Sequence, residues 1–118
     1  AYDRSLLGAI KAIDANISTA SGGLGIELPY RMLEFFQLTA SGDVFFRVTT
    51  EDGLVTIGDV DLPAPPADLP TGQPRFADTI ALGQPVRIGA YARRLEPPLA
   101  GQEGPQRVII QVAEARRS

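Results

Sequence analysis

The clearest pattern in the chain is the alternation of apolar and polar positions across residues 44–58. Two extended runs, 44–50 and 54–58, flank the sequence Glu51-Asp52-Gly53. An Asp-Gly pair between two such runs is a strong signal for a β-hairpin, because these residues accept the backbone angles of a tight turn. The pattern therefore predicts an antiparallel sheet that contains this hairpin.

A helical period precedes the hairpin. Apolar side chains recur three and four residues apart over residues 3–18, which predicts an amphipathic helix. A second helix is expected over 29–38, since a proline suits the first turn of a helix. We expect the apolar stripe of the first helix to cover one face of the sheet. The alternative is that the N-terminal part of this helix pairs with a second copy of the chain.

Three more strands are expected after the hairpin, over residues 75–82, 85–95 and 106–112. Two proline-rich segments, 62–74 and 97–105, separate them and are expected to be loops, because proline cannot donate to a sheet. Two helices followed by five strands, mostly joined as a meander, indicate an α+β fold. This layout is that of PAS-like and Cache-like sensor domains, with a five-stranded antiparallel sheet and N-terminal helices.

Composition narrows the possible functions. The chain has 118 residues, enough for one domain, and a net charge of −3, which argues against binding to nucleic acid or to an anionic membrane surface. It contains no cysteine and no histidine, so the usual thiol nucleophile, general base and zinc ligands are missing. Lys11 has no partner serine at a catalytic spacing, and Glu51 and Asp52 lie in an exposed turn. We therefore expect no enzymatic activity and no cofactor.

An acidic pair, Asp59 and Asp61, is the nearest approach to a metal motif. A calcium loop would need a following glycine and a distal glutamate at the correct spacing, and neither is present. Aspartate often stabilises turns through hydrogen bonds to its own backbone. We therefore expect turn chemistry here and no metal site.

The two ends of the chain read as cut from a longer protein. No segment approaches the roughly 20 apolar residues of a membrane span. Residues 1–4 start a helical pattern without a cap, and residues 113–118 stop where a helix could continue. A domain placed between two membrane spans would have such ends. The alternative is natural termini that fray.

Several short motifs, in this order and spacing, resemble the extracytoplasmic N-terminal domain of bacterial two-component sensor kinases. They are Ala1-Tyr2-Asp3-Arg4-Ser5-Leu6-Leu7, Leu28-Pro29, Phe46-Arg47-Val48, Asp52-Gly53, Gly58-Asp59 with Asp61-Leu62-Pro63, Arg75-Phe76, Gly83-Gln84-Pro85-Val86-Arg87 and Val112-Ala113-Glu114. The resemblance covers nearly the whole chain and includes sensors similar to the tricarboxylate-responsive kinases.

The resemblance implies that residues 1–118 form a single periplasmic domain of a histidine kinase in the bacterial inner membrane. Residues 1–20 would then be the helix next to the first membrane span, and 113–118 the start of an exit helix toward the second. It further implies a homodimer and a cytoplasmic response regulator as partner, with the kinase parts outside this chain. The alternatives are the sensor domain of another receptor class, or a soluble periplasmic binding or adaptor module.

A small anionic ligand, such as a di- or tricarboxylate, would need fixed arginines, because a guanidinium can bind a carboxylate through two parallel hydrogen bonds. Alternation places Arg47 opposite the apolar face of its strand, and places Arg87, Gly89 and Tyr91 on one face of theirs. We expect the apolar faces to pack on a helix and the polar faces to line a pocket, with Gly89 leaving room for the ligand. The residues expected to contact the ligand are Arg47, Arg87 and Tyr91, with Arg75 or Arg93 assisting. The alternative is a solvated face, or ion pairs with Asp59 and Asp61.

Overall fold

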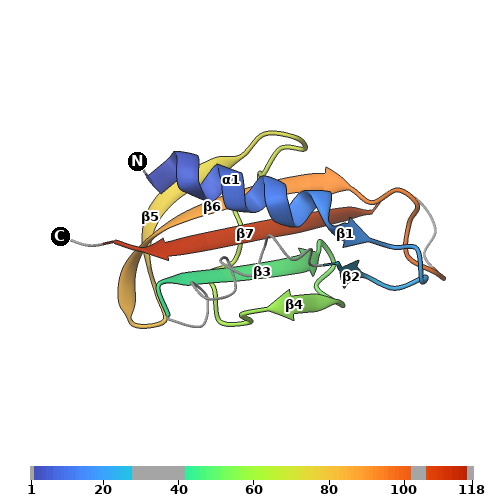
Figure 1. Cartoon of the computed structure of the whole chain (residues 1–118), viewed down its shortest axis with the longest axis horizontal. Coiled ribbons are helices and arrows are strands. Elements are labelled where there is room, and N and C mark those ends of the chain that lie inside the picture. The colour runs from blue at the N-terminus through green and yellow to red at the C-terminus, as the bar shows by residue number, and fades with distance from the viewer. Residues whose placement is uncertain (1, 28–41, 102–105, 117–118) are drawn as a thin grey trace.

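A computed structural model describes residues 2–27, 42–101 and 106–116. One helix, α1 (Tyr2–Ala15), lies across a five-stranded antiparallel sheet (Figure 1). The strands of this sheet are β3 (Val44–Thr50), β4 (Thr56–Gly58), β5 (Arg75–Ala81), β6 (Gln84–Arg94) and β7 (Arg107–Ala115). A second, two-stranded sheet pairs β1 (Ile17–Ser18) with β2 (Gly25–Ile26). The α+β class, the five strands and the N-terminal helix are confirmed, and the helix expected over 29–38 lies outside the described residues.

The strand order is β4-β3-β7-β6-β5. Three of the four connections join antiparallel neighbours, as expected for strands mostly joined as a meander, and only the β4–β5 connection crosses the sheet. The last strand, β7, lies between β3 and β6 and pairs antiparallel with both. The reason is its composition: residues 108–113 are buried on both faces of the sheet, and such a strand belongs in the centre. The outer positions go to β4 and β5, whose residues are largely exposed.

Helix α1 supplies the main core, on the front of the sheet in Figure 1. Leu6, Ile10 and Ile13 are fully buried against β3, β6 and β7, which confirms that the apolar stripe is core within one chain. The helix ends at Ala15 and not at residue 18. The side chain of Asn16 donates to the Ala12 carbonyl at 2.7 Å, which competes with helix continuation, and the chain then enters β1.

The proline-rich connection between β4 and β5 crosses the opposite face of the sheet. We call residues 59–74 the strap. Its two buried leucines are Leu62, which packs on Val86 and Ile88, and Leu69, which packs on Ala92 and other residues of the same face. The predicted loop over 62–74 is thus confirmed, and it is the cover for the face that α1 leaves open.

The carboxyl end of the described chain remains in the sheet. Residues 113–115 belong to β7, so the exit helix expected from residue 113 is wrong over this stretch. The physical reason is that their backbone pairs with β3 and β6, and the Ala115 N–H donates to the Asp43 carbonyl at 2.8 Å. In the described ranges no helix has the length and apolar character needed to cross a membrane.

Candidate functional site

Arg47 is the central polar residue beneath the strap. It extends from β3, and its Nη1 donates to the Val60 carbonyl at 3.0 Å. Nη2 donates to the Pro63 carbonyl at 2.8 Å, and both Nε and Nη2 donate to Oε1 of Gln111, at 3.1 and 2.6 Å. The guanidinium therefore connects two strands of the sheet to the start of the strap.

Gln111 completes this arrangement from β7. Its side chain is almost fully buried, with 1% exposure, and its Nε2 donates to the same Pro63 carbonyl at 2.9 Å. The Pro63 carbonyl is thus held by two side chains, Arg47 and Gln111. Sequence reasoning missed Gln111, although a single polar residue inside the apolar run 108–113 was the available signal.

The charge of Arg47 is unusual because its hydrogen-bond partners are all neutral groups. Among the described residues its guanidinium forms no ion pair with a carboxylate. It is half-buried, and burial lowers the pKa of this guanidinium below its ordinary value. A partly desolvated cation without a counter-ion is the kind of group that an anion would stabilise.

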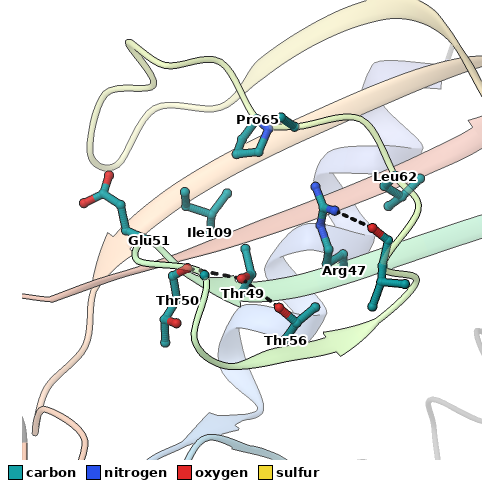
Figure 2. A pocket seen from close by; sticks show the side chains of 11 residues that line it. Arg47, Thr49, Thr50, Glu51, Thr56, Leu62, Pro65 and Ile109 are labelled. Carbon is teal, nitrogen blue, oxygen red and sulfur yellow. Dashed lines mark hydrogen bonds between the residues drawn. The ribbon is translucent and has the colours of Figure 1, made fainter.

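A cavity of about 360 Å³ lies beside Arg47, between the β3–β4 hairpin and the strap (Figure 2). The hydroxyl groups of Thr49 and Thr56 face it from adjacent strands and lie 3.1 Å apart. Leu62 and Ile109 give it an apolar wall. Glu51 also lines the cavity, and its carboxylate is paired with Arg107. A half-buried cation, two hydroxyls and an apolar wall make the part of the lining around Arg47 suitable for a small anionic molecule, since binding pockets typically combine a few polar groups with apolar surface.

A second cavity of about 250 Å³ lies on the other side of the same strap segment. It is lined by Pro63 and Pro66 of the strap, by Ala90 of β6 and by Gln111. Arg75 is on its lining, is itself exposed, and has no carboxylate in an ion pair within the described ranges. Ala64 lines both cavities, so a narrow part of the strap separates them.

The far end of the strap is held by another arginine that sequence reasoning also missed. Nη1 of Arg107 donates to the Leu69 carbonyl at 2.8 Å and lies 3.1 Å from Oγ1 of Thr71. Unlike Arg47, Arg107 has a carboxylate partner, Glu51. Their hydrogen bond lowers the pKa of Glu51 and raises that of Arg107. The two ends of the strap therefore differ in charge compensation.

Two of the predicted arginines, Arg87 and Arg93, lie on the opposite face of the sheet. Arg87 donates from Nε to Asp3 of α1 at 2.7 Å, and its Nη1 lies 3.4 Å from Asp78. The hydrogen bond with Asp3 raises the pKa of Arg87 and lowers that of Asp3. Arg93 pairs with Asp14, also on α1. These arginines form ion pairs, as in the alternative to ligand binding, but their partners are acids of α1 and β5 and not Asp59 and Asp61.

The grouping of Arg47 with Arg87 and Tyr91 in one pocket was therefore wrong. Arg47 pairs with Gln111 across the sheet, and Gln111 pairs with Ala90, so these three share the strap face. Arg87 and Tyr91 alternate with Ala90 and face α1. In β6 the polar face is the one that meets the helix, because α1 brings its own carboxylates to it.

Gly89 does not leave room for a ligand either. A Cβ atom at this position would lie 3.0 Å from Cδ1 of Ile10 and 3.0 Å from a ring carbon of Phe76. The space that the missing side chain frees is thus filled by the core. Tyr91 lines a separate cavity of about 450 Å³ at the edge of α1, together with Lys11 and Asp14.

Asp59 has a backbone partner, but the partner belongs to β3 and not to its own turn as the sequence predicted. Its Oδ2 accepts a hydrogen bond from the Phe46 N–H at 3.2 Å, and its own N–H donates to the Phe46 carbonyl at 2.8 Å. Asp59 thus closes the β3–β4 edge where the strap begins.

Comparison with protein families gives a match over residues 1–118, to the family described as two-component sensor kinase N-terminal. A comparison with curated proteins and with solved structures found no significant match to either. The family match covers the helix, the whole sheet and the strap, and it agrees with the ordered set of motifs along the chain. The chain therefore belongs to the family of two-component sensor kinase N-terminal domains.

Proposed function

We propose that this chain is the periplasmic ligand-sensing domain of an inner-membrane histidine kinase, and that it binds a small di- or tricarboxylate beneath the strap. The observation that carries the proposal is the environment of Arg47. This half-buried guanidinium, whose partners among the described residues are all neutral, lines a cavity of about 360 Å³. The family supports the sensor role, and the five-stranded sheet with an N-terminal helix supports a PAS-like or Cache-like assignment.

The proposed contacts follow from the cavity. One ligand carboxylate would bind Arg47, where it would compete with the strap carbonyls of Val60 and Pro63. The hydroxyls of Thr49 and Thr56 would donate to the same or to a second carboxylate. A charged acceptor forms stronger hydrogen bonds with a guanidinium than a peptide carbonyl does. Arg75 would assist only a ligand long enough to reach the second cavity.

Ligand binding would also change how the strap is held. If a carboxylate takes over Nη2 of Arg47, the Pro63 carbonyl keeps only Gln111 as donor. Gln111 belongs to β7, the central strand that leads to the carboxyl end of the domain. We propose that the signal passes from the strap to β7 and α1 in a homodimeric kinase, and then to a response regulator.

The test is thermal unfolding of the chain with and without succinate, malate and citrate. We expect wild type to unfold at a higher temperature with a matching ligand, since binding to the native state alone stabilises it by about 2.7 kcal/mol at 100 times Kd. Arg47→Ala should remove this ligand-dependent rise, and Arg47→Lys should retain part of it. Each variant is compared with its own ligand-free sample, because Arg47 also holds the strap.

Two matched variants separate the two faces of the sheet. Arg87→Ala removes an arginine from the α1 face and should leave the ligand-dependent rise intact. Arg94→Ala removes an exposed arginine that lines none of the three cavities described above. The proposal fails if no carboxylate stabilises wild type, or if Arg87→Ala removes the effect while Arg47→Ala does not.

The alternative is the sensor domain of another receptor class, or a soluble periplasmic binding or adaptor module. The encoding gene distinguishes them. Two apolar spans around this segment, followed by a histidine-bearing helix and an ATP-binding domain, would support the kinase, and a stop codon near Ser118 would contradict it.

A further inference from the structure

The turn between β5 and β6 has an unusual residue for its backbone. Leu82 and Gly83 connect the paired residues Ala81 and Gln84, with φ angles of 52° and 79°. Two central residues with positive φ form the tight hairpin turn that usually carries Asn-Gly. A leucine is sterically disfavoured in this conformation, and Leu82 is the one non-glycine residue with positive φ within the described ranges. A strained, non-glycine residue is a reason to look for a role outside the fold.

The same turn exposes two large aliphatic side chains. Leu82 is 44% exposed, and Ile80, two residues earlier on the edge strand β5, is 63% exposed. We call residues 80–83 the β5–β6 tip. An asparagine at position 82 and a threonine at position 80 would suit this backbone at least as well, so local folding does not account for the apolar choice.

The β5–β6 tip lies at the end of the molecule where both described chain ends lie, on the left in Figure 1. The Arg116 N–H donates to the Pro85 carbonyl at 3.0 Å, next to the tip. Asp3, in the first turn of α1, is joined to Asp78 of β5 through Arg87. The first turn of the helix, the end of the last strand and the apolar tip therefore form one end of the domain.

We propose that the β5–β6 tip inserts Ile80 and Leu82 into the interfacial region of the lipid bilayer to which the domain is attached. This inference rests on the proposed function, which places that bilayer at the end where both termini lie. Three charged groups beside the tip, Asp78, Arg87 and Arg116, are paired with one another or with Asp3, and Glu114 lies opposite Arg87 on β7. Such paired charges suit the hydrated headgroup layer and require no anionic lipid.

A bilayer fits the tip better than a protein partner does. A stable protein interface buries about 1,000 Å² or more, and two side chains on a hairpin turn cannot supply that area. A lipid interface needs no complementary groove, and each apolar side chain that enters it contributes its own favourable transfer free energy. Attachment of the chain ends would also keep the tip near the bilayer at a high effective concentration.

The absence of tryptophan from the chain provides a clean test. Ile80→Trp introduces one fluorophore at an exposed position of a strand, where tryptophan is well accepted. The chain is anchored through its carboxyl terminus to phosphatidylcholine vesicles. We expect the emission to move to shorter wavelength and to be quenched by brominated lipid. The control is Leu54→Trp, at a 77% exposed position of the β3–β4 turn. The emission of this tryptophan should remain that of a water-exposed indole.

A second substitution keeps the test independent of folding. Leu82→Asn in the Ile80→Trp background should reduce the quenching, while thermal unfolding stays equal or improves because asparagine suits the turn. Absence of quenching, or equal quenching of both tryptophans, would overturn the proposal. A spectral shift that depends on protein concentration without vesicles would overturn it in favour of a second copy. None of these variants should alter the stabilisation by carboxylates. The proposal for the β5–β6 tip can therefore be contradicted while the proposal for the ligand site is still supported.

Discussion

The two faces of the sheet are covered by elements of different kinds. On one face, α1 buries Leu6, Ile10 and Ile13 in a continuous core. On the other, the strap buries only Leu62 and Leu69 in two smaller clusters, and cavities remain on both sides of one strap segment. A helix forms its backbone hydrogen bonds internally and can present a continuous apolar stripe. A proline-rich segment lacks many N–H donors, so it forms few internal hydrogen bonds and presents no such stripe.

The difference extends to the charges. Arginines under α1 find carboxylates on the helix, as Arg87 does with Asp3 and Arg93 with Asp14. The strap instead presents backbone carbonyls that need donors, and Arg47 and Gln111 supply them. Because the strap has an irregular backbone, Arg47 has neutral partners and a cavity beside it. This comparison locates the candidate site on the strap face.

The largest expected effect tests the packing of the α1 face. Ile10→Ala should lower the free energy of unfolding by about 4 kcal/mol, because it leaves a closed cavity in the main core. Leu62→Ala, in the strap, should cost only about 2 kcal/mol, because its side chain already borders an open cavity. Urea denaturation measures both. Equal losses of unfolding free energy would show that α1 and the strap are packed equally well on the sheet.

The next effect concerns the point where the chain leaves the sheet for the strap. Gly58 has a φ of 97°, and a Cβ there would lie 2.3 Å from the Phe46 carbonyl oxygen. Gly58→Ala should therefore separate β4 from β3 and cost about 3 kcal/mol of unfolding free energy. Gly53 has a similar φ of 78°, but a Cβ added there would meet no atom within 4 Å, so Gly53→Ala should cost only about 1 kcal/mol. Urea denaturation of the two variants measures the difference, and equal costs would show that the close approach to Phe46 relaxes freely.

A third effect tests how the strap is held. Gln111→Leu removes one donor to the Pro63 carbonyl and the acceptor for Arg47, and should cost about 2 kcal/mol. Limited proteolysis should then cut the strap faster than in wild type. Gln84→Leu loses only a 3.5 Å contact with Gly42 and should not change the cleavage rate. Unchanged proteolysis in Gln111→Leu would mean that the buried leucines alone fix the strap.

The sequence was sufficient to predict much of the fold, because the strands, the first helix and the proline-rich loop depend on local periodicity. The candidate site was predictable only in part. Alternation shows which residues share a face within one strand, but not which faces of different strands coincide. That depends on long-range register, which places Ala90 and not Tyr91 beside Gln111 and Arg47. Local periodicity also did not predict the order of the strands. The central place of β7 follows from the burial of its residues on both faces of the sheet.

The smallest expected effect distinguishes the two faces by their response to acid. The hydrogen bond from Arg87 lowers the pKa of Asp3, so the folded state binds this proton less tightly than the unfolded chain does. The stabilisation is therefore complete above the ordinary aspartate value of 3.8 and is lost as the pH falls through the lower folded value. Arg47 holds the start of the strap through neutral groups, which do not titrate in this range. Thermal unfolding across acidic pH should thus be less pH-dependent in Asp3→Asn than in wild type, whereas Arg47→Lys should keep the wild-type pH dependence. If the unfolding temperature of Asp3→Asn changes with pH in parallel with that of wild type, the ion pair between Asp3 and Arg87 does not stabilise the packing of α1 on the sheet.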